Sequence, residues 1–450
     1  MENPDSSKEG LKKDTHNKSN MRKVALTALA GTSIEWYDFF LYGAAAALVF
    51  PKVFFGEFTP TVALILSLLT FSAGFIARPI GGIIFGHFGD KIGRKRTLVI
   101  ALMLMGVAST MIGLLPTYAM IGVAAPILLT LLRFVQGLAI GGQWGGAMLL
   151  VTESAPDDKR GYYGAYAQAG APVGVILANL AFIIISALVS EQFFNTWGWR
   201  IPFLASAVLI GISMYIQINL EDTNAFKQLE ALKQKKEEAN FSSIVAPSPI
   251  LEALRKYPER IFLAAGAFLS IQVTFYILIA FLLAYGVKSA GMSRDDMLIA
   301  VLVASAVMIP AQFLFSAYSD RHGRKGIFML GAILTAAWAF AVFPLVDTGN
   351  FLLIVLAISV GLLFLGMMYG PQAAFFSELF STEVRYSGAS LGYQIGAIAG
   401  GAFAPVIAVK LWNEYGIIWV SIYIAIASGL TLLSVMMLTE TYKSKLTETK

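Results

Sequence analysis

The sequence predicts an all-α membrane protein of twelve transmembrane helices that form two pseudo-symmetric six-helix bundles. Its composition is strongly apolar: of the 450 residues, 57% are hydrophobic and 14% are charged, whereas soluble domains carry about 25% charged residues. The charged residues also cluster in short polar segments. Between these segments lie apolar runs of about 20 residues or more, the length that a helix needs to cross a ~30 Å hydrocarbon core.

The apolar runs fall into two groups separated by a long polar stretch. The first group lies at 24–50, 61–86, 97–115, 122–152, 161–189 and 199–219, and the second at 260–287, 296–318, 326–346, 351–377, 387–411 and 416–438. Five segments follow from this division: an N-terminal tail (1–23), a first bundle (24–219), a linker (220–259), a second bundle (260–438) and a C-terminal tail (439–450). Glycine and proline inside the runs are compatible with spans that neighbouring helices cover.

The distribution of lysine and arginine predicts the orientation. Both tails, the linker and the loops at 87–96, 155–160 and 319–325 are rich in these residues, and the alternate loops hold few. Because basic loops stay in the cytoplasm, both termini and the linker are expected there. The net charge of +5 reflects this bias, so no nucleic-acid partner is expected. The first run is too long for a signal-peptide core and is expected to remain as a span.

The residue inventory excludes several kinds of chemistry. The chain has no cysteine, which rules out disulfides and thiolate metal sites. Its three histidines, His16, His87 and His322, lie outside the middle of every predicted span, so a buried histidine proton relay is excluded. Nothing resembles a phosphate-binding loop, a nucleophile dyad or a metal cluster. We therefore expect no enzyme activity, no bound metal or cofactor and no drive by ATP.

Two polar loops repeat in the two halves. Residues 86–96 read GHFGDKIGRKR and follow the second run, and residues 316–325 read SAYSDRHGRK and follow the eighth run. The same offset of 230 residues relates Asp90 to Asp320 and Arg94 to Arg324. Basic residues alone are common in cytoplasmic loops, but the shared spacing of Asp, Gly and Arg indicates an internal repeat.

A looser repeat lies at the cytoplasmic ends of the fourth and tenth runs. Glu153 stands seven residues before Arg160, and Glu378 stands seven residues before Arg385. Two six-helix halves related by a repeat are typical of transporters whose halves rock around a central site.

In these features the chain resembles the major facilitator superfamily, and within it the metabolite:proton symporter family, which includes shikimate, α-ketoglutarate, citrate and proline/betaine permeases. The resemblance runs from about residue 24 to residue 440. The matching motifs are Glu35-Trp-Tyr-Asp-Phe39, Arg78-Pro-Ile-Gly-Gly82, Arg133-Phe-Val-Gln-Gly137, Gly198-Trp-Arg-Ile-Pro-Phe203 and Glu383-Val-Arg-Tyr-Ser-Gly388. It implies a monomeric, multi-pass protein of the bacterial inner membrane that uses the proton as its coupling ion. Its partners would be a small-molecule substrate, protons and the lipid bilayer.

Four charged residues lie in the middle of predicted spans. At a rise of 1.5 Å per residue, Glu35, Asp38, Arg78 and Arg133 lie roughly 12–21 Å from the membrane surface. An ionised side chain there costs about 2.5–3.5 kcal/mol on insertion scales. One interpretation is that the four charges form static bridges that fix helix packing. Since buried ion pairs add little net stability, we favour a role in ion and substrate passage.

The chemistry of these groups suggests a division of roles. A carboxylate near an arginine can alternate between a charged, paired form and a neutral form, so Asp38 is the first candidate for the proton carrier and Glu35 the second. Arginine stays charged and offers a planar fork for carboxylates, so Arg133 and Arg78 could hold an anionic substrate or pair with Asp38 in its absence. Both arginines also occur in betaine and proline permeases, so they do not by themselves establish an anionic substrate.

One position departs from the family pattern. Where family members commonly have G-G-E-[WY]-G, this chain has Gly141-Gly-Gln-Trp-Gly145. Gln143 can donate and accept hydrogen bonds but cannot carry a proton. If that glutamate couples protons in relatives, this chain couples differently or assigns the step to Asp38.

Polar and aromatic side chains of the spans could complete a substrate site, although interhelical packing explains any one of them equally well. These candidates are Tyr37, Gln136, Gln143, Trp144, Gln168, Gln272, Tyr276, Tyr369, Gln372 and Gln394. The loop residues lie far from the membrane middle. The resemblance implies that they clasp the two halves together on the cytoplasmic side, with Asp90, Arg94 and Glu153 in one set and Asp320, Arg324 and Glu378 in the other.

The expected function is proton-coupled import of a small polar metabolite, an organic acid such as shikimate or a ketoacid, by alternating access. A proline/betaine-type osmolyte symporter is the main alternative. A drug:proton antiporter is a weaker one, suggested by the Gly170-Ala-Pro-Val-Gly174 run. A transporter-like receptor would need an output domain, which the short tails do not provide.

Overall fold

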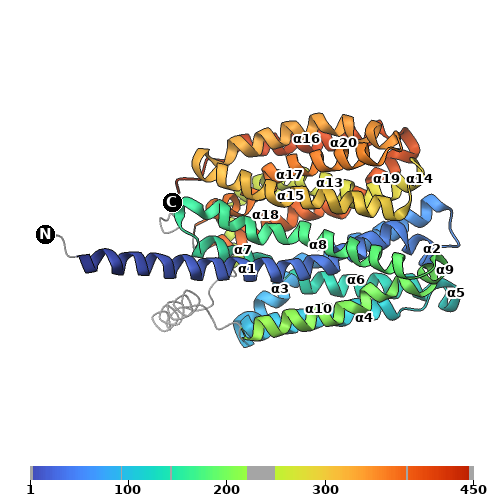
Figure 1. Cartoon of the computed structure of the whole chain (residues 1–450), viewed down its shortest axis with the longest axis horizontal. Helices are drawn as coiled ribbons and strands as arrows, with labels where there is room; N and C mark the ends of the chain where they lie inside the picture. The colour runs from blue at the N-terminus through green and yellow to red at the C-terminus, as the bar shows by residue number, and fades with distance from the viewer. Residues whose placement is uncertain (1–3, 93, 142–143, 220–248, 382–383, 445–450) are drawn as a thin grey trace.

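The computed structural model describes residues 4–92, 94–141, 144–219, 249–381 and 384–444, and no strand occurs among them. Figure 1 shows two groups of long, roughly parallel helices. The first bundle consists of α1 (Pro4–Leu48), α3 (Pro60–Ile92), α4 (Arg94–Leu114), α6 (Ala124–Gly141), α7 (Trp144–Ser154), α8 (Arg160–Leu188) and α10 (Arg200–Asn219). The second consists of α13 (Pro258–Tyr276), η3 (Ile277–Phe281), α14 (Leu282–Lys288), α15 (Arg294–His322), α16 (Arg324–Asp347), α17 (Phe351–Glu378), α18 (Arg385–Gly396), η4 (Ala397–Ala402), α19 (Ala404–Tyr415) and α20 (Ile418–Met437).

Short helices connect the long ones. They are α2 (Phe50–Phe54), α5 (Tyr118–Ile121), η1 (Asp157–Lys159), α9 (Glu191–Phe193), η2 (Phe194–Gly198) and α12 (Pro249–Lys256). All twelve predicted apolar runs fall on helices, which confirms the all-α fold. Among the described residues, nine helical segments are long and apolar enough to cross a membrane, and Val99–Leu114 and Arg200–Ile212 are shorter apolar helices. All but the last two residues of the first run lie in α1, which is already helical from Pro4 in the polar N-terminal segment.

The two bundles meet along a seam. In the first bundle α1 packs on α8, α3 on α6, and α4 on α10, and in the second bundle α16 packs on α17 and α20. Across the seam, α8 packs on α15 and α17, and α3 packs on η4 and α19. The two ends of the described chain, Pro4 and Ser444, lie at the same end of the molecule, which we call the terminal end (Figure 1). We call the opposite end the far end.

Two spans of the second bundle contain a π-helical segment at the seam. η3 lies between α13 and α14, and η4 lies between α18 and α19. At Gly401 in η4 a Cβ atom would lie 2.7 Å from Gln272 Oε1 and 2.9 Å from Phe75 Cε1, so only glycine permits this close approach. Such single-turn π segments often occur at functional sites. Here η4 packs against α13 and α3.

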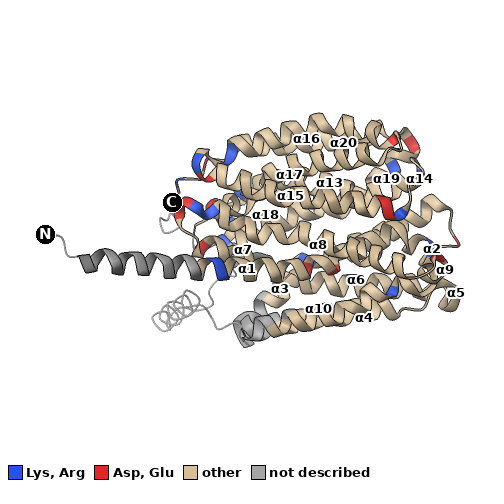
Figure 2. Ribbon diagram, viewed as in Figure 1, with Lys and Arg blue, Asp and Glu red and all other residues tan. Residues whose placement is uncertain are grey.

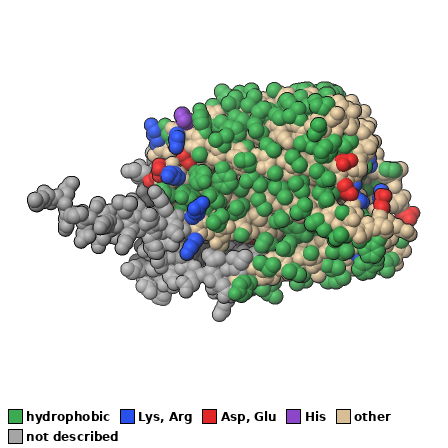
Figure 3. Space-filling model, in the orientation of Figure 1, with side chains coloured by type: hydrophobic (Ala, Val, Ile, Leu, Met, Phe, Trp, Pro, Cys, Tyr) green, Lys and Arg blue, Asp and Glu red, His purple; other side chains and the backbone are tan. Residues whose placement is uncertain are grey.

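The surface is that of a membrane-spanning protein. Between the two ends the visible face is largely covered by hydrophobic side chains (Figure 3). Exposed large hydrophobic residues of the long helices include Val107, Leu131, Ile333 and Leu430. Lys, Arg, Asp and Glu gather at the two ends, with a few in the centre of the first bundle (Figure 2). Those central charges mark the candidate site.

Candidate functional site

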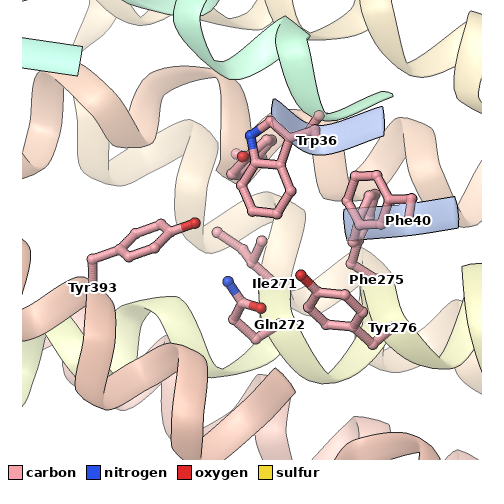
Figure 4. Close-up of a pocket in the computed structure, with 9 residues that line it drawn as sticks. Trp36, Phe40, Ile271, Gln272, Phe275, Tyr276 and Tyr393 are labelled. Carbon is pink, nitrogen blue, oxygen red and sulfur yellow. The ribbon is translucent and has the colours of Figure 1, made fainter. Parts of the chain in front are cut away.

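A small cavity lies at the seam between the bundles (Figure 4). The first bundle supplies Trp36, Phe40 and Ala171, and the second supplies Ile271, Gln272, Phe275, Tyr276, Tyr369 and Tyr393. In Figure 4 the hydroxyl groups of Tyr276 and Tyr393 and the amide of Gln272 point toward the middle of this group of side chains. The cavity has room for water but not for a metabolite. Its wall is mainly aromatic, with a few polar groups from the second bundle.

Arg78 lies beside this cavity among aromatic rings. Its guanidinium carbon is 4.3 Å from the ring centroid of Phe39, 4.5 Å from that of Phe75 and 5.3 Å from that of Trp36. The side chain is buried, and within the described part of the chain its Nε and Nη2 have no hydrogen-bond partner. One of these rings, Trp36, also lines the cavity. Arg78 therefore has N–H groups without hydrogen-bond partners next to the cavity. Cation–π contacts hold its guanidinium in place.

A second group of polar side chains lies inside the first bundle. Gln136 links the two charges: its Oε1 accepts a hydrogen bond from Arg133 Nη1 (3.1 Å), and its Nε2 donates to Asp38 Oδ2 (3.0 Å). The Ser109 hydroxyl also donates to Asp38 Oδ2, and Gln136 Nε2 lies 2.6 Å from Ser109 Oγ. Asp38 Oδ1 is buried without a partner among the described residues. We call Asp38, Ser109, Arg133 and Gln136 the carboxylate network.

An aromatic layer separates this network from the cavity. The Arg133 guanidinium lies 4.1 Å from the ring centroid of Phe39, 4.3 Å from that of Tyr42 and 4.8 Å from that of Phe71. Phe39 therefore contacts both arginines, and Phe71 lines a second small cavity in the seam. Asp38 points toward α4 and α6 and does not line either cavity. Neither Arg78 nor Arg133 lines a cavity, but Arg78 contacts Trp36, which does.

The other predicted site residues divide into those on the cavity and those off it. Gln272, Tyr276 and Tyr369 line the cavity. Tyr37 lies off it, because its hydroxyl donates to the carbonyl of Pro202 in α10 (2.9 Å). A helix turns about 100° per residue, so Trp36 and Phe40 occupy the cavity side of α1 and Tyr37 faces another helix.

The remaining candidates are placed as follows. Gln168 and Gln372 bond to each other across the seam at 2.7 Å. Gln394 is buried and does not line the cavity. Glu35 is half-buried and has no polar partner among the described residues. Gln143 and the side chain of Trp144 lie outside the described residues.

Sequence reasoning missed several residues of the site. Trp36 and Phe40 line the cavity, and Phe39 and Phe75 hold Arg78. The spacing of Trp36 and Phe40 places both on one face of α1, but aromatic residues of a membrane helix can equally face lipid. No pattern in the sequence points to Ser109.

At the terminal end the looser repeat forms two ion pairs across the seam. Arg160 of the first bundle pairs with Glu378 of the second (3.1 Å), and Arg385 of the second pairs with Glu153 of the first (3.2 Å). Each arginine therefore reaches the glutamate of the other half. The pairs join the two bundles at the terminal end and include Glu153 and Glu378, two of the residues that the resemblance assigns to a clasp.

The second-half loop motif supports the same contact. Arg324 pairs with Asp320 (2.6 Å) and with Glu378 (3.1 Å). Asp320 also accepts hydrogen bonds from the backbone N–H groups of Gly161 (2.7 Å) and Tyr162 (2.8 Å). These are free donors at the start of α8, so the carboxylate caps a helix of the other bundle. The side chains of Asp90 and Arg94, from the first-half motif, lie outside the described residues.

The bundles also touch near the far end. Asn179 Nδ2 donates to the carbonyl of Leu298 (3.2 Å), and Ser186 is bonded to Asp295 (2.8 Å) and Arg294 (2.7 Å). Polar contacts thus join the halves on both sides of the cavity.

We expect Glu378→Gln to lower the thermal unfolding temperature clearly. Glu378 is buried with two arginines, and removing one partner of a buried ion pair costs about 3–5 kcal/mol. A matched control is Glu252→Gln, because Glu252 pairs with Lys256 at 2.6 Å on the exposed face of α12. That pair contributes about 1 kcal/mol or less. Equal shifts of the two variants in detergent would contradict the importance of the Glu378 contacts.

Comparison with known proteins agrees with this architecture. Residues 28–392 match the Major Facilitator Superfamily. The inner membrane metabolite transport protein YhjE of Escherichia coli K12 is 40% identical over 431 residues, which cover 94% of this chain and 95% of that protein. The shikimate transporter of the same organism is 38% identical (91% and 92% covered), and the proline/betaine transporter of Salmonella typhimurium is 31% identical (94% and 84% covered).

Solved structures share the fold. The crystal structure of the D-xylose-proton symporter superposes with a TM-score of 0.71, covering 94% of this chain and 98% of that chain at 18% identity. At that identity the likeness concerns the fold alone.

Proposed function

Because the chain belongs to the major facilitator superfamily, we propose that it is a proton-coupled symporter that imports a small polar metabolite, an organic acid such as shikimate or a ketoacid. The observation that carries the proposal is a pair of buried arginines, Arg133 within the carboxylate network and Arg78 beside the central cavity. The relatives named as metabolite and shikimate transporters support this substrate class.

In this proposal Arg78 binds the substrate carboxylate. Its two unpartnered nitrogens can donate to a carboxylate that enters the cavity, and a planar guanidinium suits that geometry. Gln272, Tyr276 and Tyr393 would contact the rest of the substrate. Since the cavity has room only for water, the surrounding side chains must move when substrate enters.

Asp38 carries the proton, with Glu35 as the second candidate. Protonation of Asp38 removes the negative charge nearest Arg133 and leaves the charges of the two arginines that contact Phe39 uncompensated. A substrate carboxylate at Arg78 then becomes more favourable, because charges interact strongly in a dry site. By reciprocity, bound substrate favours protonation of Asp38. Proton and substrate therefore bind together, as symport requires.

Asp38 also offers an explanation for Gln143, which stands where family members commonly have a glutamate. A glutamine cannot carry a proton. We propose that the coupling step belongs to the carboxylate network in this chain.

The proposed orientation places the terminal end in the cytoplasm of a bacterial inner membrane. Its support is the concentration of lysine and arginine there. The ion pairs of Glu378 and Glu153 then close the cytoplasmic side, and import requires that they open.

A second candidate function is osmolyte symport of the proline/betaine kind. The aromatic cavity wall favours it, because Trp36, Tyr276 and Tyr393 could hold a quaternary ammonium group by cation–π contact. The relative named as a proline/betaine transporter supports it as well.

Uptake into proteoliposomes tests the proposal. We expect an inside-alkaline proton gradient to drive accumulation of shikimate or a ketoacid, and collapse of the gradient to abolish it. Accumulation of proline or betaine instead would favour the osmolyte function. Uptake driven only by the opposite gradient would contradict symport and indicate an antiporter.

A further inference from the structure

We infer that the substrate leaves through a second polar station, outside the central cavity, at the junction of α8, α15 and α17. The station consists of Gln168, Gln312, Ser316 and Gln372. It would take water first and then the hydroxyl and carboxylate groups of the substrate. The inference rests on the proposed transport function, which supplies the direction of travel toward the terminal end.

Gln168 and Gln372 form the boundary between the cavity and the station. Gln168 Nε2 donates to Gln372 Oε1 (2.7 Å) and to the backbone carbonyl of Tyr369 (3.2 Å). Tyr369 lines the cavity, so this amide pair lies at the cavity wall. Because the two glutamines belong to different bundles, the bond must break when the halves separate at the terminal end.

Several polar atoms of the station lack hydrogen-bond partners. In the described part of the chain, both amide atoms of Gln312, the hydroxyl of Ser316 and Nε2 of Gln372 are buried without a hydrogen bond. An unpaired buried polar group costs stability. Side chains that serve as interhelical glue would be bonded to one another. These groups are instead arranged to gain partners when water or substrate enters.

Ser316 connects the station to the charged contacts at the terminal end. A Cβ atom on Gly370 of α17 would lie 2.6 Å from Ser316 Oγ, and one on Gly161 of α8 would lie 2.9 Å from the Ser316 carbonyl oxygen. Ser316 is therefore held between the two helices. One turn further along α15, Asp320 caps α8. Opening of the Arg160–Glu378 pair would separate α8 from α15 and α17 and expose this path.

The absence of native cysteine makes single-cysteine labelling a direct test. Ser316→Cys is compared with Ser428→Cys in the full-length chain in proteoliposomes, using a small methanethiosulfonate reagent. Ser428 is equally buried but is bonded to Ser270 inside the second bundle. With Glu378→Gln present to weaken the terminal contacts, we expect Ser316→Cys to react about tenfold faster than Ser428→Cys or more, because labelling tracks local opening. Equal rates would overturn the inference.

A second measurement does not depend on labelling. Gln312→Leu removes an amide without partners, so its thermal unfolding temperature should be equal to or above that of the parent. Gln136→Leu removes an amide that is bonded to Arg133, Asp38 and Ser109, and its unfolding temperature should fall. A fall of the same size in Gln312→Leu would show a structural role and overturn the station. Neither measurement uses substrate or a proton gradient. A negative result in either would therefore overturn the station and leave the proposal of proton-driven uptake unaffected.

Discussion

Asp38→Asn should abolish accumulation driven by a proton gradient while leaving exchange of substrate across the membrane intact. Asparagine keeps an oxygen that can accept hydrogen bonds from Ser109 and Gln136, so the packing of α1 against α4 and α6 is retained. It cannot take up or release a proton. The internal substrate concentration should therefore reach the external concentration and rise no further.

The control for this variant is Asp347→Asn. Asp347 is an acid at the end of α16 that accepts a hydrogen bond from the Tyr285 hydroxyl (2.6 Å) and lies outside the carboxylate network. Its substitution should leave accumulation unchanged. Normal accumulation in a well-expressed Asp38→Asn protein would remove Asp38 from its role and direct attention to Glu35.

Arg78→Lys should weaken substrate binding about tenfold or more, equivalent to about 1.4 kcal/mol. Lysine keeps the charge but loses the planar fork and the stacking on Phe39 and Phe75 that positions it. Arg78→Gln should weaken binding further because the charge is lost as well. Equilibrium binding to the purified protein measures both effects.

The comparison with Arg133→Lys separates the two arginines. Arg133 donates a hydrogen bond to Gln136 and contacts the ring of Phe39. Its substitution should therefore disturb the carboxylate network and reduce proton-driven accumulation more than it reduces substrate affinity. Unchanged affinity in Arg78→Lys would assign Arg78 to helix packing. A loss of affinity confined to Arg133→Lys would reverse the proposed roles.

Much of this arrangement could be predicted from the sequence. Apolar runs of membrane length determined the helices, and the motif around Asp320 and Arg324 located the terminal contacts. The depths of Asp38, Arg78 and Arg133 along their helices also placed them together, because a rise per residue converts directly to depth.

The sequence could not predict which way the side chains point or which residues they pair with. The spacing of Glu153 and Arg160 indicated a repeat but not their partners, because the ion pairs with the other half depend on how the bundles dock. Depth alone did not reveal that Asp38 turns toward α4 and away from the cavity. The rotation of α1 about its axis decides that, and its apolar residues face both lipid and protein.

The central claim is that protonation of Asp38 and carboxylate binding at Arg78 favour each other. The most direct test adds substrate to the purified protein in weakly buffered solution, with no gradient, and records the change in pH. This coupling means that the parent protein takes up protons as substrate binds, and that Asp38→Asn binds substrate without proton uptake. Equal proton uptake by Asp38→Asn, or none by the parent at saturating substrate, would contradict it.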